Sequence, residues 1–153
     1  MTENIQIEDV FDSVLVSMTK ALTGMELVRV MPEEWTEKNT LIETIITYGK
    51  FDSCMWFEVG MDLYEQIISA MNGGIPPEEE EKLLYMNEYV NIVCGRAISV
   101  INNKMGKASR LSVPKFQKSI GEETVRKPGE EKKELVYRTE KGFLHFVVLY
   151  TLQ

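Results

Sequence analysis

Residues 76–106 read PPEEEEKLLYMNEYVNIVCGRAISVINNKMG, and this stretch predicts the longest helix of the chain. Its two prolines suit the first turn of a helix, and the glutamates at 78–81 would lie at the positive end of the helix dipole. Apolar residues then recur at helical spacing as far as Met105, and Gly106 stands where a C-terminal cap belongs. We therefore expect one helix that begins in the acidic block and ends near Met105.

On a helical wheel, the predicted helix has an apolar face and a mixed face. The apolar face, which we expect to pack on the core, comprises Leu83, Met86, Val90, Val93, Cys94, Ala97, Val100 and Ile101. The mixed face carries Glu88, Asn91 and Gly95 at spacings i, i+3 and i+7. Leu84 and Ile92 share this face. Exposed apolar residues beside polar ones suggest a docking surface, although ordinary solvated helices also carry Glu and Asn on their outer face.

Gly95 stands inside the predicted helix, where glycine costs about 1 kcal/mol relative to alanine. One interpretation is a shallow notch beside Asn91 through which another backbone could approach. The other is close packing of the helix against another element of the same chain.

The remainder of the chain predicts shorter helices and a set of strands. These elements are helices at 10–22 and 62–71 and strands at 41–48, 54–59, 113–120, 124–127, 135–139 and 143–152. Gly24 would cap the first helix, and Asp62 with Glu65 would cap the second. Residues 143–150 are apolar on both faces, as in a central strand, and the charged residues 130–134 predict an exposed turn. We expect a single α+β domain over residues 1–153, a mainly antiparallel sheet packed with the long helix and shorter ones.

The composition excludes several classes of function. The chain has 153 residues, with 24 Asp and Glu against 17 Lys and Arg, and a formal net charge of −7. It has no basic block of the kind that contacts phosphates in nucleic acid. No apolar run reaches the roughly 18 residues of a membrane-spanning helix, and the first residues do not read as a signal peptide. We expect a cytoplasmic protein that binds neither nucleic acid nor a membrane.

The residues that commonly form reactive or metal sites are few and scattered. Cys54 and Cys94 make no disulfide framework, and a single histidine, His145, argues against a zinc site. We expect both thiols to be structural and His145 to be packed and hydrogen-bonded. We therefore predict no metal site in this chain.

The spacing beyond the long helix is more specific. Glu88-Tyr89-Val90-Asn91 is followed, after 22 intervening residues, by Pro114. This pattern resembles the signature of the CheC/CheX/FliY family of chemotaxis phosphatases, and the order of predicted elements is similar as well. A single Glu-x-x-Asn copy is more similar to CheX than to CheC. The fuller family pattern has Asp or Ser four residues before the Glu, where this chain has Leu84.

The resemblance implies an activity and roles for individual residues. A CheX-like protein hydrolyses the aspartyl phosphate of a CheY-type response regulator and so terminates a chemotaxis signal. By resemblance, Asn91 would orient the attacking water, Glu88 would pair with the active-site lysine of the receiver, and Pro114 would be structural. The neighbours on the same helix face would bind the partner: Leu84, Ile92 and Gly95. The resemblance further implies a homodimer with no cofactor of its own, with Mg²⁺ held by the partner receiver domain.

Two other hypotheses remain open from the sequence. Leu84, in place of Asp or Ser, motivates a non-catalytic module that binds a receiver or another signalling protein without hydrolysis. The third hypothesis is a small-ligand sensor, which would use a pocket away from the long helix.

Overall fold

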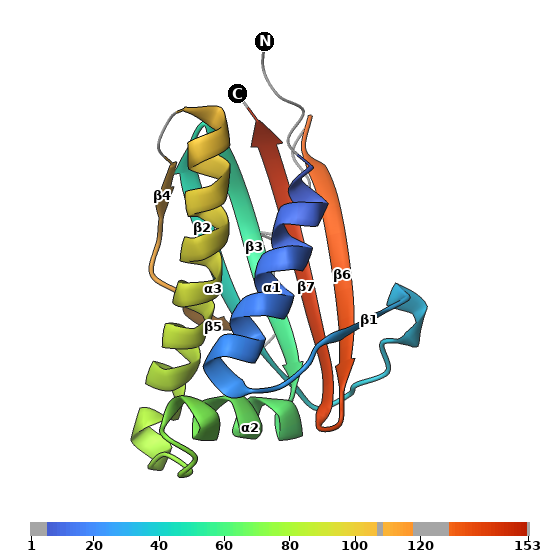
Figure 1. The fold of residues 1–153 in the computed structure, drawn as a ribbon, viewed down its shortest axis with the longest axis vertical. Helices are drawn as coiled ribbons and strands as arrows, with labels where there is room; N and C mark the ends of the chain where they lie inside the picture. Colours follow the sequence, from blue (N-terminus) through green and yellow to red (C-terminus); the bar gives the residue numbers. More distant parts are fainter. Residues whose placement is uncertain (1–5, 107–108, 118–128, 153) are drawn as a thin grey trace.

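The computed structural model of the chain describes residues 6–106, 109–117 and 129–152, and Figure 1 shows a twisted β-sheet with helices on one face. The elements in chain order are α1 (Ile7–Thr23), β1 (Val28–Val30), the 3₁₀ helix η1 (Pro32–Glu34), β2 (Thr40–Gly49), β3 (Phe51–Gly60), α2 (Met61–Met71), the 3₁₀ helix η2 (Glu79–Glu81), α3 (Lys82–Met105), β4 (Ser109–Leu111), β5 (Lys115–Gln117), β6 (Glu131–Thr139) and β7 (Gly142–Leu152). The predicted α+β fold is confirmed.

The sheet is antiparallel throughout the described strands. Its order is β1-β6-β7-β3-β2-β4, with β5 also pairing β2. Two hairpins, β2–β3 and β6–β7, meet where β3 pairs β7, so β7 is a central strand as expected. A helix precedes each hairpin, α1 before the first and α3 before the second, and the two helices lie side by side on the sheet (Figure 1).

The central strand is buried on both faces, as its sequence predicts. Leu144, Phe146 and Val148 join the large core beneath the helices. Val147 and Leu149 alternate with them and join a smaller apolar cluster with Ile42 and Trp56 on the opposite face of the sheet.

Helix α3 follows the predicted division into two faces, with differences at its edges. Its buried residues are Met86, Tyr89, Val90, Val93, Cys94, Ala97, Ile98 and Ile101. Tyr89 is buried because α1 packs beside it, and its hydroxyl lies 2.7 Å from Thr19 Oγ1. Leu83, placed on the core face by the wheel, is 38% exposed because it lies in the first turn, beyond most of the core contacts.

The acidic block does not form the first turn of the α-helix. Residues Glu79–Glu81 form the 3₁₀ helix η2, and α3 begins at Lys82. Lys82 contacts Glu65 and Glu79, each at 3.0 Å, so the helix start is tied to α2 as well as to the block. Tightening of the first turn in this way is common at helix ends.

The second helix also begins differently from the prediction. Its N-cap is Gly60, and no side chain caps it, because α2 follows β3 directly. Asp62 and Glu65 therefore form no capping pair, and Glu65 accepts from Lys82 instead. The first helix does end as predicted, with Gly24 in the left-handed conformation at φ 78°.

The strands predicted at 41–48, 54–59, 135–139 and 143–152 lie within β2, β3, β6 and β7, whereas the predictions fail at the start of β6 and at the sheet edges. Residues 131–134 belong to β6 rather than to an exposed turn, because Lys132 and Lys133 pair with β7. Of the strand expected at 113–120, β5 covers Lys115–Gln117, and the short strand β4, which was not predicted, lies before Pro114. Residues 118–120 and 124–127 lie outside the described residues. The edge strand β1, which pairs β6, was not predicted. In the described part of the chain, no helix has the length and apolarity needed to cross a membrane.

Candidate functional site

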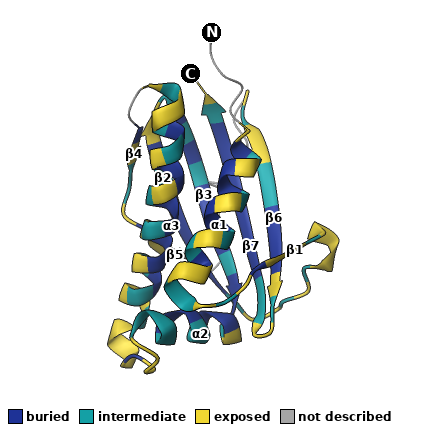
Figure 2. Cartoon of the chain, in the orientation of Figure 1, coloured by how far each residue is buried: buried dark blue, intermediate teal, exposed yellow. Residues whose placement is uncertain are grey.

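The mixed face of α3 forms an exposed ridge, made of Leu84, Glu88, Asn91, Ile92 and Gly95, which we call the motif ridge. Glu88 and Asn91 are exposed, Leu84 is 64% exposed, and Ile92 and Gly95 are half-buried. Figure 2 shows exposed residues along the side of α3 that faces away from the sheet. Helix periodicity thus places all five predicted residues on one face.

The two polar side chains of the ridge are uncommitted within the chain. Among the described residues, neither Glu88 nor Asn91 forms a hydrogen bond or an ion pair. They lie one turn apart, so a carboxylate and a carboxamide project together from the same part of the helix surface. This pair offers one negative charge and one neutral donor–acceptor group to anything that docks on the ridge.

Gly95 opens onto space rather than onto a neighbouring element. A Cβ built on Gly95 would meet no atom within 4 Å in the described part of the chain, apart from its own helix. Of the two interpretations of this glycine, the structure therefore excludes internal close packing. The backbone at Gly95 is accessible to an approaching partner.

The first turn of α3 is anchored to α2. Besides the contacts of Lys82, the hydroxyl of Tyr85 donates to Asn72 Oδ1 at 2.7 Å, just beyond the end of α2. Ile75, 66% exposed, lies in the connection between these helices and adds apolar surface close in sequence to Leu83 and Leu84. Ile75 was not predicted as part of the docking surface, because a loop residue belongs to no helical stripe.

A polar pair lies beneath the ridge and was not predicted: Glu43 is buried and Asn87 is half-buried. The side-chain amide of Asn87, the neighbour of Glu88, lies against Glu43 of β2. We assign its nitrogen to the side that faces the carboxylate, because in that orientation it donates to Oε1 and Oε2 of Glu43 at 2.8 and 2.7 Å. Glu43 is 0% exposed, and burial raises the pKa of its carboxyl to about 7. A sequence signal did exist: Glu43 alternates with Leu41 and Ile45 and so shares their inward face.

Pro114 is buried in the connection between β4 and β5. Just before it, the amide of Ser112 donates to the carbonyl of Ile46 at 2.9 Å, and Ser112 Oγ accepts from the amide of Ile46 at 3.0 Å. The segment around Pro114 therefore runs along β2, the strand that carries Glu43. A proline here has a fixed φ and no amide donor, which suits a strand break.

A family model described as chemotaxis phosphatase CheX matches residues 41–138, a range that contains the motif ridge and Pro114. The chain belongs to the CheX family. No match was found among curated proteins.

Solved structures with the same fold include CheX and CheC-like proteins. The chemotaxis protein CheX from Vibrio vulnificus is 18% identical, with 96% of this chain and 97% of that chain covered at a TM-score of 0.77. A CheC-like superfamily protein from Shewanella sp. PV-4 is 19% identical, with 97% and 99% covered at 0.78. A chain from the CheX–CheY–BeF₃–Mg²⁺ complex of Borrelia burgdorferi is 13% identical, with 96% and 99% covered at 0.73.

The cysteines and the histidine of this CheX family member do not belong to the ridge, and Cys94 lies on the buried face of α3. Cys94 is fully buried, and burial raises the pKa of its thiol well above the usual range, which disfavours the nucleophilic thiolate. His145 is packed and hydrogen-bonded as predicted, with Nε2 2.6 Å from Glu134 Oε2 and the tilted ring of Trp35 5.0 Å away between centroids. Within residues 6–106, 109–117 and 129–152, no group of three or more potential metal ligands was found.

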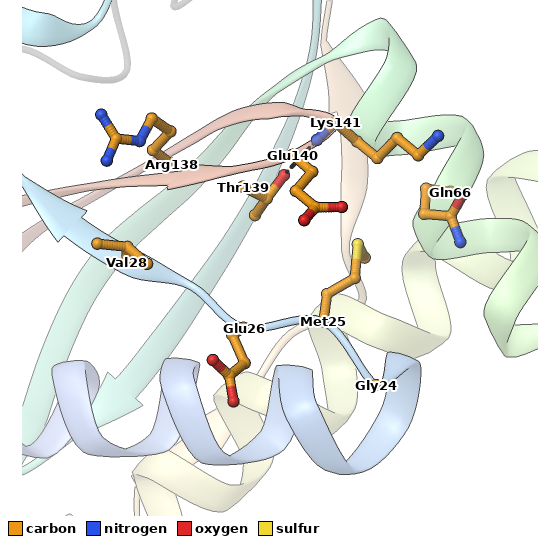
Figure 3. A pocket seen from close by; sticks show the side chains of 9 residues that line it. All are labelled: Gly24, Met25, Glu26, Val28, Gln66, Arg138, Thr139, Glu140 and Lys141. Atoms are coloured by element: carbon orange, nitrogen blue, oxygen red, sulfur yellow. Dashed lines mark hydrogen bonds between the residues drawn. The ribbon is translucent and has the colours of Figure 1, made fainter.

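The hollow drawn in Figure 3 bears on the small-ligand hypothesis. It has a volume of about 590 Å³ and lies between the α1–β1 connection, α2 and the β6–β7 turn, with no residue of α3 in its lining. Met25 and Glu140 extend into it from opposite sides, and its charged groups have both signs, Glu26 and Glu140 against Arg138 and Lys141. It is half open and of mixed charge, so it does not favour any one ligand class in this CheX family chain.

Proposed function

We propose that this chain accelerates hydrolysis of the aspartyl phosphate on a CheY-type response regulator by inserting Glu88 and Asn91 into the receiver's active site. The observation that carries the proposal is the motif ridge, where these two side chains are exposed and uncommitted beside the open backbone of Gly95. Membership of the CheX phosphatase family supports it. So does the Borrelia burgdorferi complex, which joins CheX to CheY with BeF₃ and Mg²⁺.

In this reaction the chain mainly has to position groups, because the receiver supplies the phosphoryl group and the metal ion. A water oxygen attacks phosphorus, the bond between phosphorus and the aspartate oxygen breaks, and inorganic phosphate and a free carboxylate are released. Because phosphoryl transfer depends mainly on alignment and charge stabilisation, an amide that orients the water is sufficient help. The Asn91 carbonyl accepts from that water, and its neutral amide does not act as a base.

Glu88 supplies the complementary charge. Its carboxylate pairs with the receiver's active-site lysine and fixes the depth and direction of the insertion. Leu84 and Ile92 contact the receiver surface around this pair, and the notch at Gly95 lets the receiver backbone come close. The chain needs no cofactor of its own in this scheme, because Mg²⁺ belongs to the receiver.

The test is a phosphate-release assay on a phosphorylated CheY-type receiver. Wild type should accelerate release, and Asn91→Ala and Glu88→Ala should each lower the rate by about 10²-fold or more, the scale of lost positioning. Matched controls are Asn103→Ala and Glu80→Ala, which make the same replacements at exposed positions outside the ridge. Equal rates for wild type and both ridge variants would refute the mechanism.

A non-catalytic member of the same fold is the second candidate, and exposed Leu84 is the observation that favours it. Such a module would bind a receiver through the same ridge without accelerating phosphate release. Binding measured by calorimetry, together with a release rate equal to that of the receiver alone, would establish this candidate instead.

We also propose that the chain is a cytoplasmic homodimer, in keeping with a soluble receiver as its partner. Light scattering at micromolar concentration should give twice the monomer mass of 17.6 kDa. A mass equal to the monomer value would remove the homodimer from the proposal.

A further inference from the structure

The Glu43 side chain is a carboxyl group buried among apolar residues of the core. It points from β2 into the core between Leu41 and Ile45, and no part of the residue is exposed. Burying a carboxylate is unfavourable unless its oxygens are hydrogen-bonded, so this residue needs a specific partner. Among the described residues, the partner is Asn87 of α3, which donates to both carboxylate oxygens.

The other elements around Glu43 do not neutralise its charge. Phe57 of β3 and Phe116 of β5 lie opposite it in the sheet. Tyr64 of α2 also lies nearby: burial raises the pKa of its hydroxyl, and the charges of Glu65 and Glu43 raise it further. In the described part of the chain, no cation forms an ion pair with Glu43.

Asn87 occupies a special position on α3. It directly precedes Glu88 and lies one turn before Asn91, at the border between the buried face and the motif ridge. Other polar contacts join α3 to helices: Tyr85 and Lys82 to the α2 region, and Tyr89 to α1. One more joins it to the sheet: Asn102 Oδ1 accepts from the amide of Ser109 in β4 at 2.9 Å, about four turns beyond Glu88. The bonds from Asn87 to Glu43 are the described polar link between the turn that carries Glu88 and the sheet beneath it.

We propose that Glu43 and Asn87 are a positioning pair that sets the rotation of α3 about its axis, so that the ridge residues Glu88 and Asn91 point in the direction that the receiver requires. The consequence for catalysis rests on the proposed function; the positioning itself does not. The apolar stripe decides which face of α3 meets the core, but each apolar contact is non-directional, whereas a two-bond link is directional.

The geometry gives the scale of the effect. Side-chain atoms lie about 6 Å from a helix axis, so a rotation of about 10° moves them by about 1 Å. A displacement of that size at a catalytic group can lower the rate by about 10²-fold. A rotation of α3 by about 10° is therefore enough to lower kcat measurably.

The pair also has two states near neutral pH, which gives a second readout. Ionised Glu43 accepts from the Asn87 amide nitrogen; protonated Glu43 can donate to the Asn87 amide oxygen after the amide turns over. Because the carboxyl has a pKa of about 7, both states are populated in neutral solution. His145 projects from the opposite face of the sheet, beside Glu134 and Glu58, so it does not contact the pair.

The kinetic arm measures kcat and receiver affinity for three variants. Asn87→Ala should lower kcat by 10- to 100-fold and leave affinity for a BeF₃-treated receiver within about threefold of wild type. Glu43→Gln, which can still pair with Asn87, should keep kcat within about threefold. The double variant Glu43→Leu with Asn87→Leu removes both polar groups of the pair and leaves neither without its partner, so it should fold stably and still have the low kcat. Wild-type kcat in that folded double variant would overturn the proposal.

The spectroscopic arm does not depend on catalysis. In wild type, the NMR amide signals of Asn87 and residues 88–91 should shift with pH around 7, and in Glu43→Gln this shift should disappear. Signals at 88–91 that do not titrate in wild type and do not change in Asn87→Ala would overturn the positioning role. A wild-type protein without any acceleration of phosphate release would refute the proposed function alone, and the spectra would still decide the role of the pair.

Discussion

Replacing Gly95 by alanine should stabilise the protein and weaken its function at the same time. Gly95 lies in the interior of α3, and an added Cβ would meet no atom within 4 Å in the described chain. The helix should therefore gain the propensity difference between alanine and glycine, about 1 kcal/mol. For a domain of this size, that gain corresponds to a rise in melting temperature of about 2–4 °C.

The functional effect has the opposite sign because the same methyl group would occupy the notch in the motif ridge. Forcing one extra carbon into a close-packed contact costs about 1–3 kcal/mol. The receiver should then bind about 5- to 150-fold more weakly. Asn91 keeps its place one turn away, so the rate at saturating receiver should fall less than the affinity.

Two measurements on the Gly95→Ala variant test these opposite effects. Thermal unfolding measures its stability, and calorimetric titration with the receiver measures its affinity. Ser99→Ala is the matched control, because it also raises helix propensity at an exposed position of α3 but adds no atom. A Gly95→Ala variant that melts below wild type would show that the position is packed, contrary to the structure. A more stable variant with unchanged receiver affinity would remove Gly95 from the docking surface.

Three further predictions concern the site and its support. Glu43→Gln should abolish a pH dependence of stability. In wild type the folded state keeps the Glu43 proton up to a pKa of about 7, whereas the unfolded chain releases it near 4.5, so the free energy of unfolding should fall by about 3 kcal/mol between about pH 4.5 and 7. Urea titrations measure this fall, and an equal change of unfolding free energy with pH in the variant would contradict the prediction. Leu84→Asp should raise the phosphate-release rate several-fold, because it supplies the residue type of the fuller family pattern at an exposed position. A rate at or below that of wild type would leave Leu84 as a docking residue only. Tyr89→Phe leaves Thr19 Oγ1 buried without its 2.7 Å partner and should cost about 1–3 kcal/mol in denaturant unfolding; an unchanged midpoint would mean that the bond contributes nothing.

The sequence predicted the parts of the fold that depend on local periodicity. The division of α3 into two faces, the glycine caps at Gly24 and Gly106 and the β6–β7 hairpin all follow from spacing within a few residues of each other. The errors lie where distant segments decide the outcome. Edge strand β1 forms only because β6 offers it an edge to pair with, and Leu83 is exposed because the core ends before the first turn of α3.

The candidate site, like the fold, has features that local sequence predicts and features that depend on tertiary contacts. The sequence by itself determined that Glu88, Asn91 and Gly95 share one face, because the helical repeat is a property of the local backbone. It did not determine that this face is exposed and uncommitted, or that Gly95 opens onto space. The buried bonds between Glu43 and Asn87 were decided by tertiary structure alone, because they join a strand and a helix that are far apart in the chain and meet only when α3 packs on the sheet.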